Sequence, residues 1–391
     1  MRWNAAPPIC RAPSMVLRRS AWASAWGCPR WSSGLATRAQ GLDMPERRTP
    51  AVFYRGGTSK AVFFHTADLP EGLQERDRML LEVLGSPDPY GRQLNGLGGG
   101  ISSLSKAMWV ERSKRNDADI DYTFAQIAID QPIVDTSANC GNMSSAVGQF
   151  AVDEGIFPVD DGDAVIRMYN TNTDICVHSH FKVAGARAVT GGDLEIPGVA
   201  GTGAPVRLEF MDPARVTGRG LLPTGQVRET IDAPGFGAVP VSIVDAAALC
   251  VFVPAEFFGL KACEAPEDIE ANEPVMAALE AIRREAAVRA GLCERVEDAA
   301  LSAPRIALVA APGAFHSLEG REYQREGFDL AVRMVSMGTI HRAVMVTGAM
   351  CLAAASQIGG SVPHSCAAGA GDEGAVRLGN PSGVTVLGAS V

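Results

Sequence analysis

Two residues of this chain have the type and the setting for acid and base chemistry, and the first is a cysteine in a turn. Residues 132–138 predict the end of a strand, Cys140 follows in a turn rich in Asn and Gly, and from Met143 the apolar residues recur at helical spacing. The free N–H groups of a helix start can lower the pKa of a nearby thiol and can also bind carboxylates. The segment therefore predicts a proton-transfer group beside an anion site, with a buried structural cysteine as the alternative.

The second residue is a lysine that ends a glycine-rich loop. Residues 95–105 supply many N–H and hydroxyl donors, and Lys106 follows them before a strand predicted over residues 107–111. Most lysines are surface cations, but a lysine beside an anion-binding loop can have its pKa tuned for proton transfer. The loop lacks the Gly-x-x-x-x-Gly-Lys-Ser/Thr pattern, so nucleotide phosphate is rejected as its ligand. Which of Lys106 and Cys140 takes the first proton stays open.

A predicted hairpin supplies further donors for an anion. Residues 51–64 contain two apolar runs joined by a Gly-Gly turn. Arg55, Thr58, Ser59 and Lys60 crowd this turn, and convergent donors on a glycine-rich turn suit a carboxylate. A solvated hairpin tip is the alternative.

Histidine and cysteine alternate along one predicted strand. Cys176, His178 and His180 share one face of the strand predicted over residues 175–183. Ligands two residues apart on one strand rarely converge on a tetrahedral ion, and no fourth ligand is evident. We therefore predict no metal site, and the remaining histidines give no Ser-His-Asp arrangement.

The elements around Cys140 are repeated in the second half of the chain. A strand predicted over residues 305–311 and a run over residues 330–338 precede an apolar helix that contains Cys351, again in the order strand, turn and helix. The repetition predicts a duplicated architecture with two helix starts that face each other across a cleft. Two amphipathic helices are assigned to packing, over residues 69–84 and 274–290.

Composition indicates the domain boundaries. Residues 1–48 carry eight arginines against two acids and are excluded from the fold, either as an organellar transit peptide or as a misread start before Met44. A glycine-rich shift near residue 191 separates two predicted domains, over residues 49–190 and 191–378. Residues 379–391 predict one more loop and strand, and their return to the first domain is left open.

Charge and cysteine content favour an intracellular globular protein. The chain has 391 residues, of which 47% are hydrophobic and 20% charged. Its nine cysteines include no CxxC pair, which favours reduced thiols. The net charge is −9 although the leader is basic, which excludes nucleic acid as a partner, and the apolar runs are too short for a membrane span. We expect a cytoplasmic protein, or one of the mitochondrial matrix if residues 1–48 are a transit peptide.

Several motifs, in order along the chain, resemble the 2-methylaconitate cis-trans isomerase (PrpF) family, whose relatives include 4-oxalomesaconate tautomerases and methylitaconate delta-isomerases. In the first half these motifs are Arg55-Gly-Gly-Thr-Ser-Lys60, Ser86-Pro-Asp-Pro-Tyr-Gly91, the glycine-rich loop ending in Ser105-Lys106, Asp130-Gln-Pro132, Asn139-Cys-Gly-Asn142 and Asn170-Thr-Asn-Thr173. In the second half they are Gly198-Val-Ala-Gly-Thr-Gly-Ala-Pro205, Ser336-Met-Gly338, His341-Arg-Ala343 and Thr347-Gly-Ala349.

The resemblance implies a diaminopimelate-epimerase-like α+β fold, with two similar domains that each wrap a curved sheet around a central helix. It also implies catalysis between the domains by Lys106 and Cys140, without a cofactor or a metal. One departure is the segment 245–249, where relatives commonly carry an Asn-Pro pair, and this puts the exact substrate in doubt. The predicted substrate-binding residues are Arg55, Thr58, Ser59, Gly99, Gly100, Ser103, Gly141, Asn142, Met143, Asn172, Arg333, Ser336, Thr347 and Gly348, with Arg333 as the cation of the second domain.

The predicted function is a shift of the double bond, or of its cis-trans geometry, in an unsaturated di- or tricarboxylate that resembles 2-methylaconitate. The alternatives are a 4-oxalomesaconate tautomerase, a methylitaconate delta-isomerase and a non-catalytic carboxylate-binding accessory protein. An amino-acid racemase of the same fold would need a second thiol, which the predicted turn at residues 346–348 lacks. The expected partner is a small carboxylate, and a homodimer is compatible with the sequence.

Overall fold

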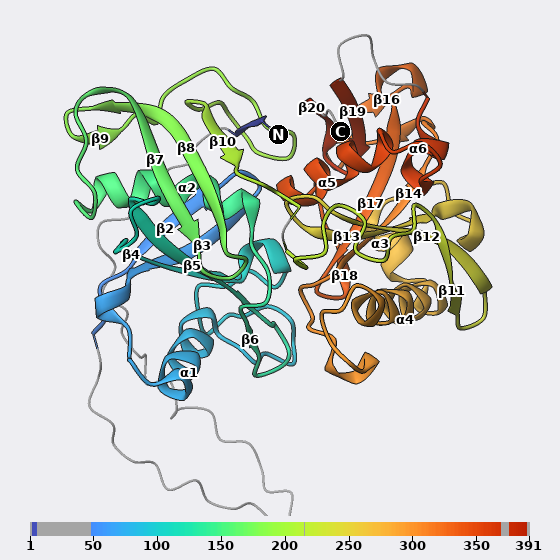
Figure 1. Ribbon diagram of the computed structural model, residues 1–391, viewed down its shortest axis with the longest axis horizontal. Helices are drawn as coiled ribbons and strands as arrows, with labels where there is room; N and C mark the ends of the chain where they lie inside the picture. Colours follow the sequence, from blue (N-terminus) through green and yellow to red (C-terminus); the bar gives the residue numbers. More distant parts are fainter. Residues whose placement is uncertain (1, 6–47, 215, 369–374, 389–391) are drawn as a thin grey trace, which may run out of the picture.

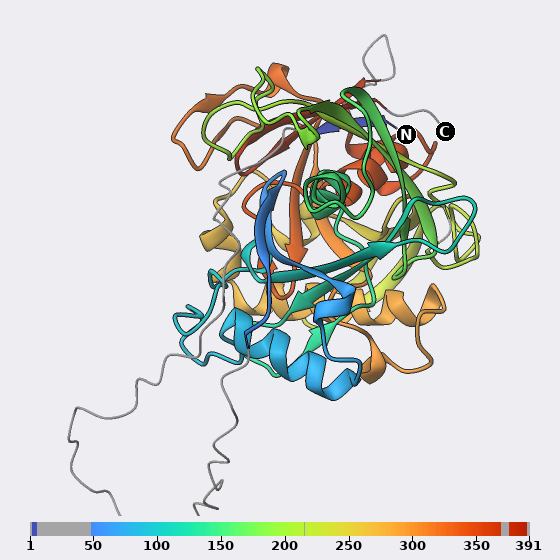
Figure 2. The same cartoon turned by 90° about the vertical axis from the view of Figure 1, so that its left-hand side faces the viewer.

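Two curled β-sheets, each with a helix against its inner face, make up most of the molecule (Figures 1 and 2). The computed structural model describes residues 2–5, 48–214, 216–368 and 375–388. The first sheet contains β1 (Arg2–Ala5), β2 (Val52–Gly56), β3 (Ser59–His65), β4 (Lys106–Arg112), β5 (Ile120–Ile127), β6 (Val134–Asp135), β7 (Gly162–Asn170), β8 (Ile175–Ala184), β9 (Arg187–Ala188) and β10 (Val206–Phe210).

The second sheet follows the first in the sequence. Its strands are β11 (Glu229–Ala233), β12 (Gly237–Asp245), β13 (Leu249–Pro254), β14 (Arg305–Ala310), β17 (Leu330–Ser336), β18 (Thr339–Ile340), β19 (Ala375–Asn380) and β20 (Gly383–Gly388). A separate hairpin pairs β15 (Phe315–His316) with β16 (Glu322–Tyr323). The α-helices are α1 (Leu73–Leu84), α2 (Gly141–Asp153), α3 (Pro266–Glu270), α4 (Glu273–Arg289), α5 (Val346–Ser356) and α6 (Val362–Cys366).

The two sheets repeat one strand pattern. Antiparallel and parallel pairs alternate along the order β2, β3, β4, β5, β7, β8, and the order β12, β13, β14, β17, β19, β20 repeats them pair by pair. One ion pair is repeated as well, because Arg167 binds Asp119 in the first sheet as Arg377 binds Asp329 in the second. The predicted duplication and the α+β class are therefore confirmed.

The helices α2 and α5 occupy the centre of the molecule. Figure 2 shows α2 end-on, with strands of the first sheet around it. All residues from Gly141 to Val152 of α2 and all residues of α5 are buried, as expected for helices that are covered on every side. A single hydrophobic cluster contains both helices and the inner faces of both sheets, so the two halves share one core.

Each sheet is also covered on its outer face, by α1 in the first half and by α4 in the second. In β4, Met108 and Val110 pack around α2, whereas Ala107 and Trp109 pack on the side of α1. Strands with two covered faces are apolar on both, and for this reason the sequence of a central strand does not reveal which face is which. The structure assigns the faces through these contacts.

Most predicted elements are present with shifted ends. The helix predicted over residues 69–84 starts only at Leu73, because its N-cap Gly72 still has an extended backbone, and it ends before Gly85 as predicted. The short 3₁₀ helix η1 (Thr66–Asp68) precedes it. The helix predicted over residues 274–290 is α4, whose N-cap Asn272 accepts a hydrogen bond from Val275 N at 3.3 Å.

The two ends of the chain lie against the sheets. Arg2–Ala5 of the leader pair with β10, whereas residues 6–47, which include Met44, lie outside the described residues. The strand β20 pairs with β19 in the second sheet, so this part of the tail does not join the first sheet. Among the helices described, none has the length and apolar character that a bilayer crossing requires.

Candidate active site

The starts of the two central helices meet at the boundary between the halves. The N-cap residues are Cys140 for α2 and Met345 for α5. A Cβ atom placed on Gly141 would lie 2.6 Å from Thr347 Cγ2, so a larger residue there would collide with α5. The two helix starts therefore face each other, as the repeated sequence pattern predicts.

Both helix starts carry N–H groups that need an acceptor. The first N–H groups of any helix have no partner within the helix, and no side chain of the described residues caps α2 or α5. The first turns, Gly141 to Met143 and Val346 to Gly348, are nevertheless buried. Because buried N–H groups without an acceptor are costly, and both helix ends are positive, a carboxylate suits this place.

Hydrogen bonds from both halves fix the turn that carries Cys140. Asn139 Oδ1 accepts from Ser144 Oγ at 3.2 Å and from Asn170 Nδ2 at 3.4 Å. Asn139 O accepts from Arg305 Nη2, which lies on β14 of the second sheet, at 2.6 Å. The Cys140 side chain is only 6% exposed, and its thiol is free of any disulfide. The thiol is thus held at the α2 start in a buried setting.

A second contact docks the same turn on the other half. Asp135 Oδ2 accepts from Ser302 N at 2.9 Å, and Ser137 Oγ lies 3.0 Å from Ser302 Oγ. Asp135 Oδ1 also accepts from Ser137 N at 2.8 Å. The segment before Cys140 is therefore bound to the second half at more than one point.

Lys106 begins β4 on the face of the first sheet that packs on α2. Side chains alternate along a strand, so Lys106 shares its face with Met108 and Val110, which belong to the core around α2. The side chain is 5% exposed. Its Nζ donates to Gln126 Oε1 and lies 5.2 Å from the centre of the Phe124 ring. The structure therefore buries this lysine beside the α2 start.

The two candidate proton-transfer groups interact electrostatically. Burial lowers the pKa of Lys106, a negative charge on Cys140 raises it, and the positive charge of Arg305 lowers it. Lys106 and Cys140 thus lie close enough for a charge on Cys140 to act on Lys106.

A buried glutamine shapes the glycine-rich loop. Gln93 is 1% exposed, and its Nε2 donates to Ser86 Oγ at 2.8 Å and to Ser105 Oγ at 2.7 Å. Its Oε1 accepts from Gly100 N at 3.0 Å, so this N–H group, which we predicted as an anion donor, already has an acceptor. Ser103 is buried in the 3₁₀ helix η2 (Ser102–Leu104) close to Lys106, and Gly99 packs on Leu104.

The hairpin of β2 and β3 closes over the start of α2. A Cβ atom on Gly56 would lie 2.3 Å from Asn142 O, so only glycine permits this approach. Thr58 Oγ1 accepts from Asn142 Nδ2 at 3.1 Å. Ser59 faces α2, is 2% exposed, and its Oγ has no hydrogen-bond partner among the described residues. A buried hydroxyl at this place, without a partner among the described residues, can donate a hydrogen bond to a bound carboxylate.

Arg305 is the cation that the second half brings to the helix starts, and our prediction from the sequence missed it. It begins β14 on the face toward α5, together with Ala307 and Val309. It is 8% exposed, and besides its bond to Asn139 O its Nη1 donates to Thr347 Oγ1. Arg305 therefore connects the Cys140 turn to the start of α5.

The prediction of Arg333 as the second-domain cation is not supported. In β17 the residues Val332 and Met334 face α5, so Arg333 points to the opposite face. There its Nε donates to Glu264 O at 2.8 Å, and burial lowers its pKa to about 10. Both faces of β17 are covered, so the sequence did not show the direction of this side chain.

Two other predicted binding residues have different surroundings. Asn172 donates to Phe124 O and Thr136 O and accepts from Phe124 N, at 2.8 to 2.9 Å, so its amide supports the Cys140 turn. Arg55 alternates with Tyr54, which packs around α2, and its Nη1 donates to Gly57 O at 2.8 Å. The structure does not place either side chain at the helix starts.

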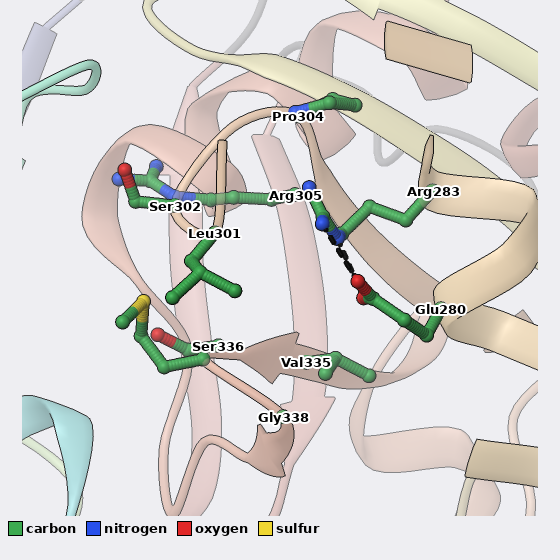
Figure 3. A pocket seen from close by; sticks show the side chains of 10 residues that line it. Glu280, Arg283, Leu301, Ser302, Pro304, Arg305, Val335, Ser336 and Gly338 are labelled. Atoms are coloured by element: carbon green, nitrogen blue, oxygen red, sulfur yellow. Dashed lines mark hydrogen bonds and ion pairs between the residues drawn. The ribbon is translucent and has the colours of Figure 1, made fainter. Parts of the chain in front are cut away.

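A small pocket of the second half adjoins Arg305 (Figure 3). It is lined by Glu280, Arg283, Leu301, Ser302, Pro304, Arg305, Val335, Ser336, Met337 and Gly338. In Figure 3 the side chain of Arg305 extends away from the ion pair of Arg283 with Glu280 and toward Ser302. Ser336 lines the same pocket, so this predicted binding residue does lie near Arg305. Gly348 packs instead on Met334.

His341 is a second residue that the sequence prediction did not assign, although it lies in one of the quoted motifs. Its Nδ1 accepts from Ala343 N at 3.1 Å, which leaves the ring proton on Nε2. Burial lowers the pKa of His341 to about 4, and the positive charges of Lys106 and Arg305 act in the same direction. The imidazole is therefore neutral near pH 7 and can only donate from Nε2.

We expect the buried His341 to make the fold less stable in acid. The unfolded imidazole titrates near pH 6.5, so between about pH 6.5 and 4 only the unfolded chain binds the proton. The contribution is complete above about pH 6.5 and is lost as the pH falls toward 4. In urea unfolding, the change from pH 7 to pH 5 should cost the native protein about 2 kcal/mol more than His341→Gln. Equal losses would show that this histidine does not titrate as described.

The comparisons with known proteins concern nearly the whole folded chain. The family model described as PrpF protein matches residues 46–391. The chain is 38% identical to a 2-methyl-aconitate isomerase of Shewanella oneidensis and 39% identical to one of Cupriavidus necator, in each case over 88% of this chain and 90% of the relative. The crystal structure of a methylitaconate-delta-isomerase superposes with a TM-score of 0.70 at 35% identity, over 88% of this chain and 89% of the other.

Proposed function

This chain belongs to the PrpF family of isomerases and has the diaminopimelate-epimerase-like fold, and from this premise we propose that it isomerises an unsaturated di- or tricarboxylate that resembles 2-methylaconitate. In such a substrate an allylic C–H group is acidified by its conjugated carboxylate. A base removes this proton and leaves a dienolate. An acid then returns a proton to another carbon, so that the double bond moves, or to the same carbon after rotation, so that its geometry changes.

The observation that carries the proposal is the meeting of two uncapped, buried helix starts beside a buried lysine and a buried thiol. The reaction needs a base, an acid and preorganised donors for the developing negative charge. We assign the proton transfers to Lys106 and Cys140. The carboxylates would be held by the N–H groups of both helix starts, by Ser59 and by the charge of Arg305.

Two alternative functions, a racemase and a non-catalytic accessory protein, fit the site less well. A racemase that uses two thiols needs a second one opposite Cys140, but the equivalent N-cap of α5 is Met345. An accessory protein would need neither the lysine nor the thiol, and both are buried at the helix starts. We therefore favour the isomerase, with methylitaconate and 4-oxalomesaconate as the competing substrates.

Proton NMR in deuterated water tests the proposal. The purified full chain is incubated with 2-methylaconitate, methylitaconate, the aconitate isomers and 4-oxalomesaconate in turn. Migration of the double bond, or deuterium uptake, in one of these compounds supports the isomerase and identifies its substrate. Saturable binding without any exchange would favour the accessory protein instead.

Replacing Arg305 should lower kcat/KM more than replacing Arg333, another buried arginine of the second half. Arg305→Met removes a buried charge that also holds Asn139 and Thr347, and we expect kcat/KM to fall about 10- to 100-fold. Arg333→Met is the matched control, because Arg333 is buried on the opposite face of the same sheet. Melting temperatures of both variants separate a loss of folding from a loss of binding. Equal kinetics in the two folded variants would contradict the assignment of Arg305.

A further inference from the structure

We propose that Gln126 is a positioning residue for proton transfer, which holds Lys106 Nζ in place through a neutral amide oxygen. The inference rests on the proposed role of Lys106. Gln126 lies on β5 directly opposite Lys106 in the register of β4 and β5, so the two side chains share the face toward α2. It is 3% exposed, and its Oε1 accepts from Lys106 Nζ.

The orientation of this amide is fixed by its other hydrogen bonds. Gln126 Nε2 donates to Ser102 O at 3.0 Å and to Ser105 O at 2.9 Å. Both hydrogens of the amide are thus used on carbonyl groups, which leaves only Oε1 to face Nζ. Since the two carbonyls belong to the segment that leads into Lys106, Gln126 couples the lysine to the glycine-rich loop.

The neutrality of the amide has a chemical consequence. A carboxylate at the same place would stabilise the ammonium and raise the pKa of Lys106, whereas an amide supplies a hydrogen bond without a net charge. Burial is the largest influence on the pKa of this lysine, and the charged groups that act on it are Cys140 and Arg305. Lys106 in turn lowers the pKa of His341. Gln126 therefore allows Lys106 to be fixed and still to give up its proton.

The test replaces this acceptor in two ways. For Gln126→Glu we expect the acidic limb of the kcat/KM profile to move up by about one pH unit or more, with about a tenfold loss at pH values below the limb that is recovered at high pH. For Gln126→Leu we expect kcat to fall about 10- to 100-fold with a KM close to that of the native protein, because no hydrogen bond to Gln126 holds Lys106 Nζ in position.

Carbon NMR of the lysine Cε atoms reports the titration of Lys106 without reference to activity. Its midpoint should rise in Gln126→Glu and should not rise in Gln126→Leu. The control is Gln149→Leu, which changes a buried glutamine of α2 and should leave kcat and the pH profile unchanged. If Gln126→Glu fails to fold, Gln126→Leu decides the question through its kcat.

An unmoved titration in folded Gln126→Glu, or full kcat in Gln126→Leu, would overturn the proposal. A loss of activity in folded Gln126→Glu that is the same at every pH would also overturn it, because it would indicate a purely structural role. Failure of the proposed function is distinguishable, since in that case the native protein itself would show neither double-bond migration nor deuterium uptake with any of the carboxylates.

Discussion

In a Lys106→Arg variant, kcat is expected to fall about a thousandfold or more, while the variant still binds the carboxylate substrate. Arginine keeps the positive charge and several donors, but its guanidinium is not deprotonated in proteins and cannot serve as a base. Lys106→Met, which has a similar length and no charge, should lose as much. The agreement of the two variants would assign the loss to proton transfer rather than to charge.

Deuterium uptake and double-bond migration, followed by proton NMR, measure both variants. Circular dichroism and melting temperatures check the fold, because either change leaves the buried Gln126 Oε1 without its normal partner. If Lys106 is the base, the native protein should show an acidic limb in its pH profile below the ordinary lysine range of about 10.4, since burial lowers the pKa of Lys106. More than a tenth of native activity in Lys106→Ala would contradict the assignment.

The parts of the site that the sequence predicted are those with a local signal. A cysteine between Asn139 and Gly141 before a helical pattern, and a lysine after a glycine-rich loop, can be recognised without any knowledge of tertiary contacts. The duplicated fold was also predictable, because the order of strand, turn and helix occurs in both halves of the sequence. Boundaries of the helices were less certain, as the late start of α1 shows.

The residues that were missed depend on register and on the direction of side chains. Gln126 carries no sequence signal, and only its pairing opposite Lys106 reveals it. Arg305 and Arg333 occur in similar apolar strands that are covered on both faces, so their sequences do not tell which arginine faces α5. A comparison of the two halves could have found Arg305, because it begins β14 as Lys106 begins the equivalent strand β4.

The two halves of the duplicated fold place different side chains at equivalent positions of the site. The first half places a lysine at the start of β4 and a thiol at the N-cap of α2, whereas the second half places Arg305 and Met345 at the equivalent positions. Neither arginine nor methionine exchanges protons near neutral pH. We therefore infer that the first half transfers protons and that the second half supplies charge and N–H groups to hold the carboxylates.

Replacement of Cys140 should have the second large effect on the rate of isomerisation. Cys140→Ala should lower the rate of isomerisation about 100- to 1000-fold, because it removes one of the two groups to which we assign proton exchange with the substrate. Met345→Leu, at the equivalent N-cap of α5, is the matched control and should keep nearly native kinetics. A folded Cys140→Ala variant with native kcat would exclude the thiol from the reaction.

The same variants decide which group takes the first proton. If Lys106 is the base and Cys140 the acid, Cys140→Ala in deuterated water should still exchange the allylic hydrogen for deuterium without moving the double bond, and Lys106→Met should exchange nothing. If the thiolate is the base, the two results are reversed, because a variant that lacks the base cannot form the dienolate. The loss of exchange in both variants would mean that neither group can remove the proton alone.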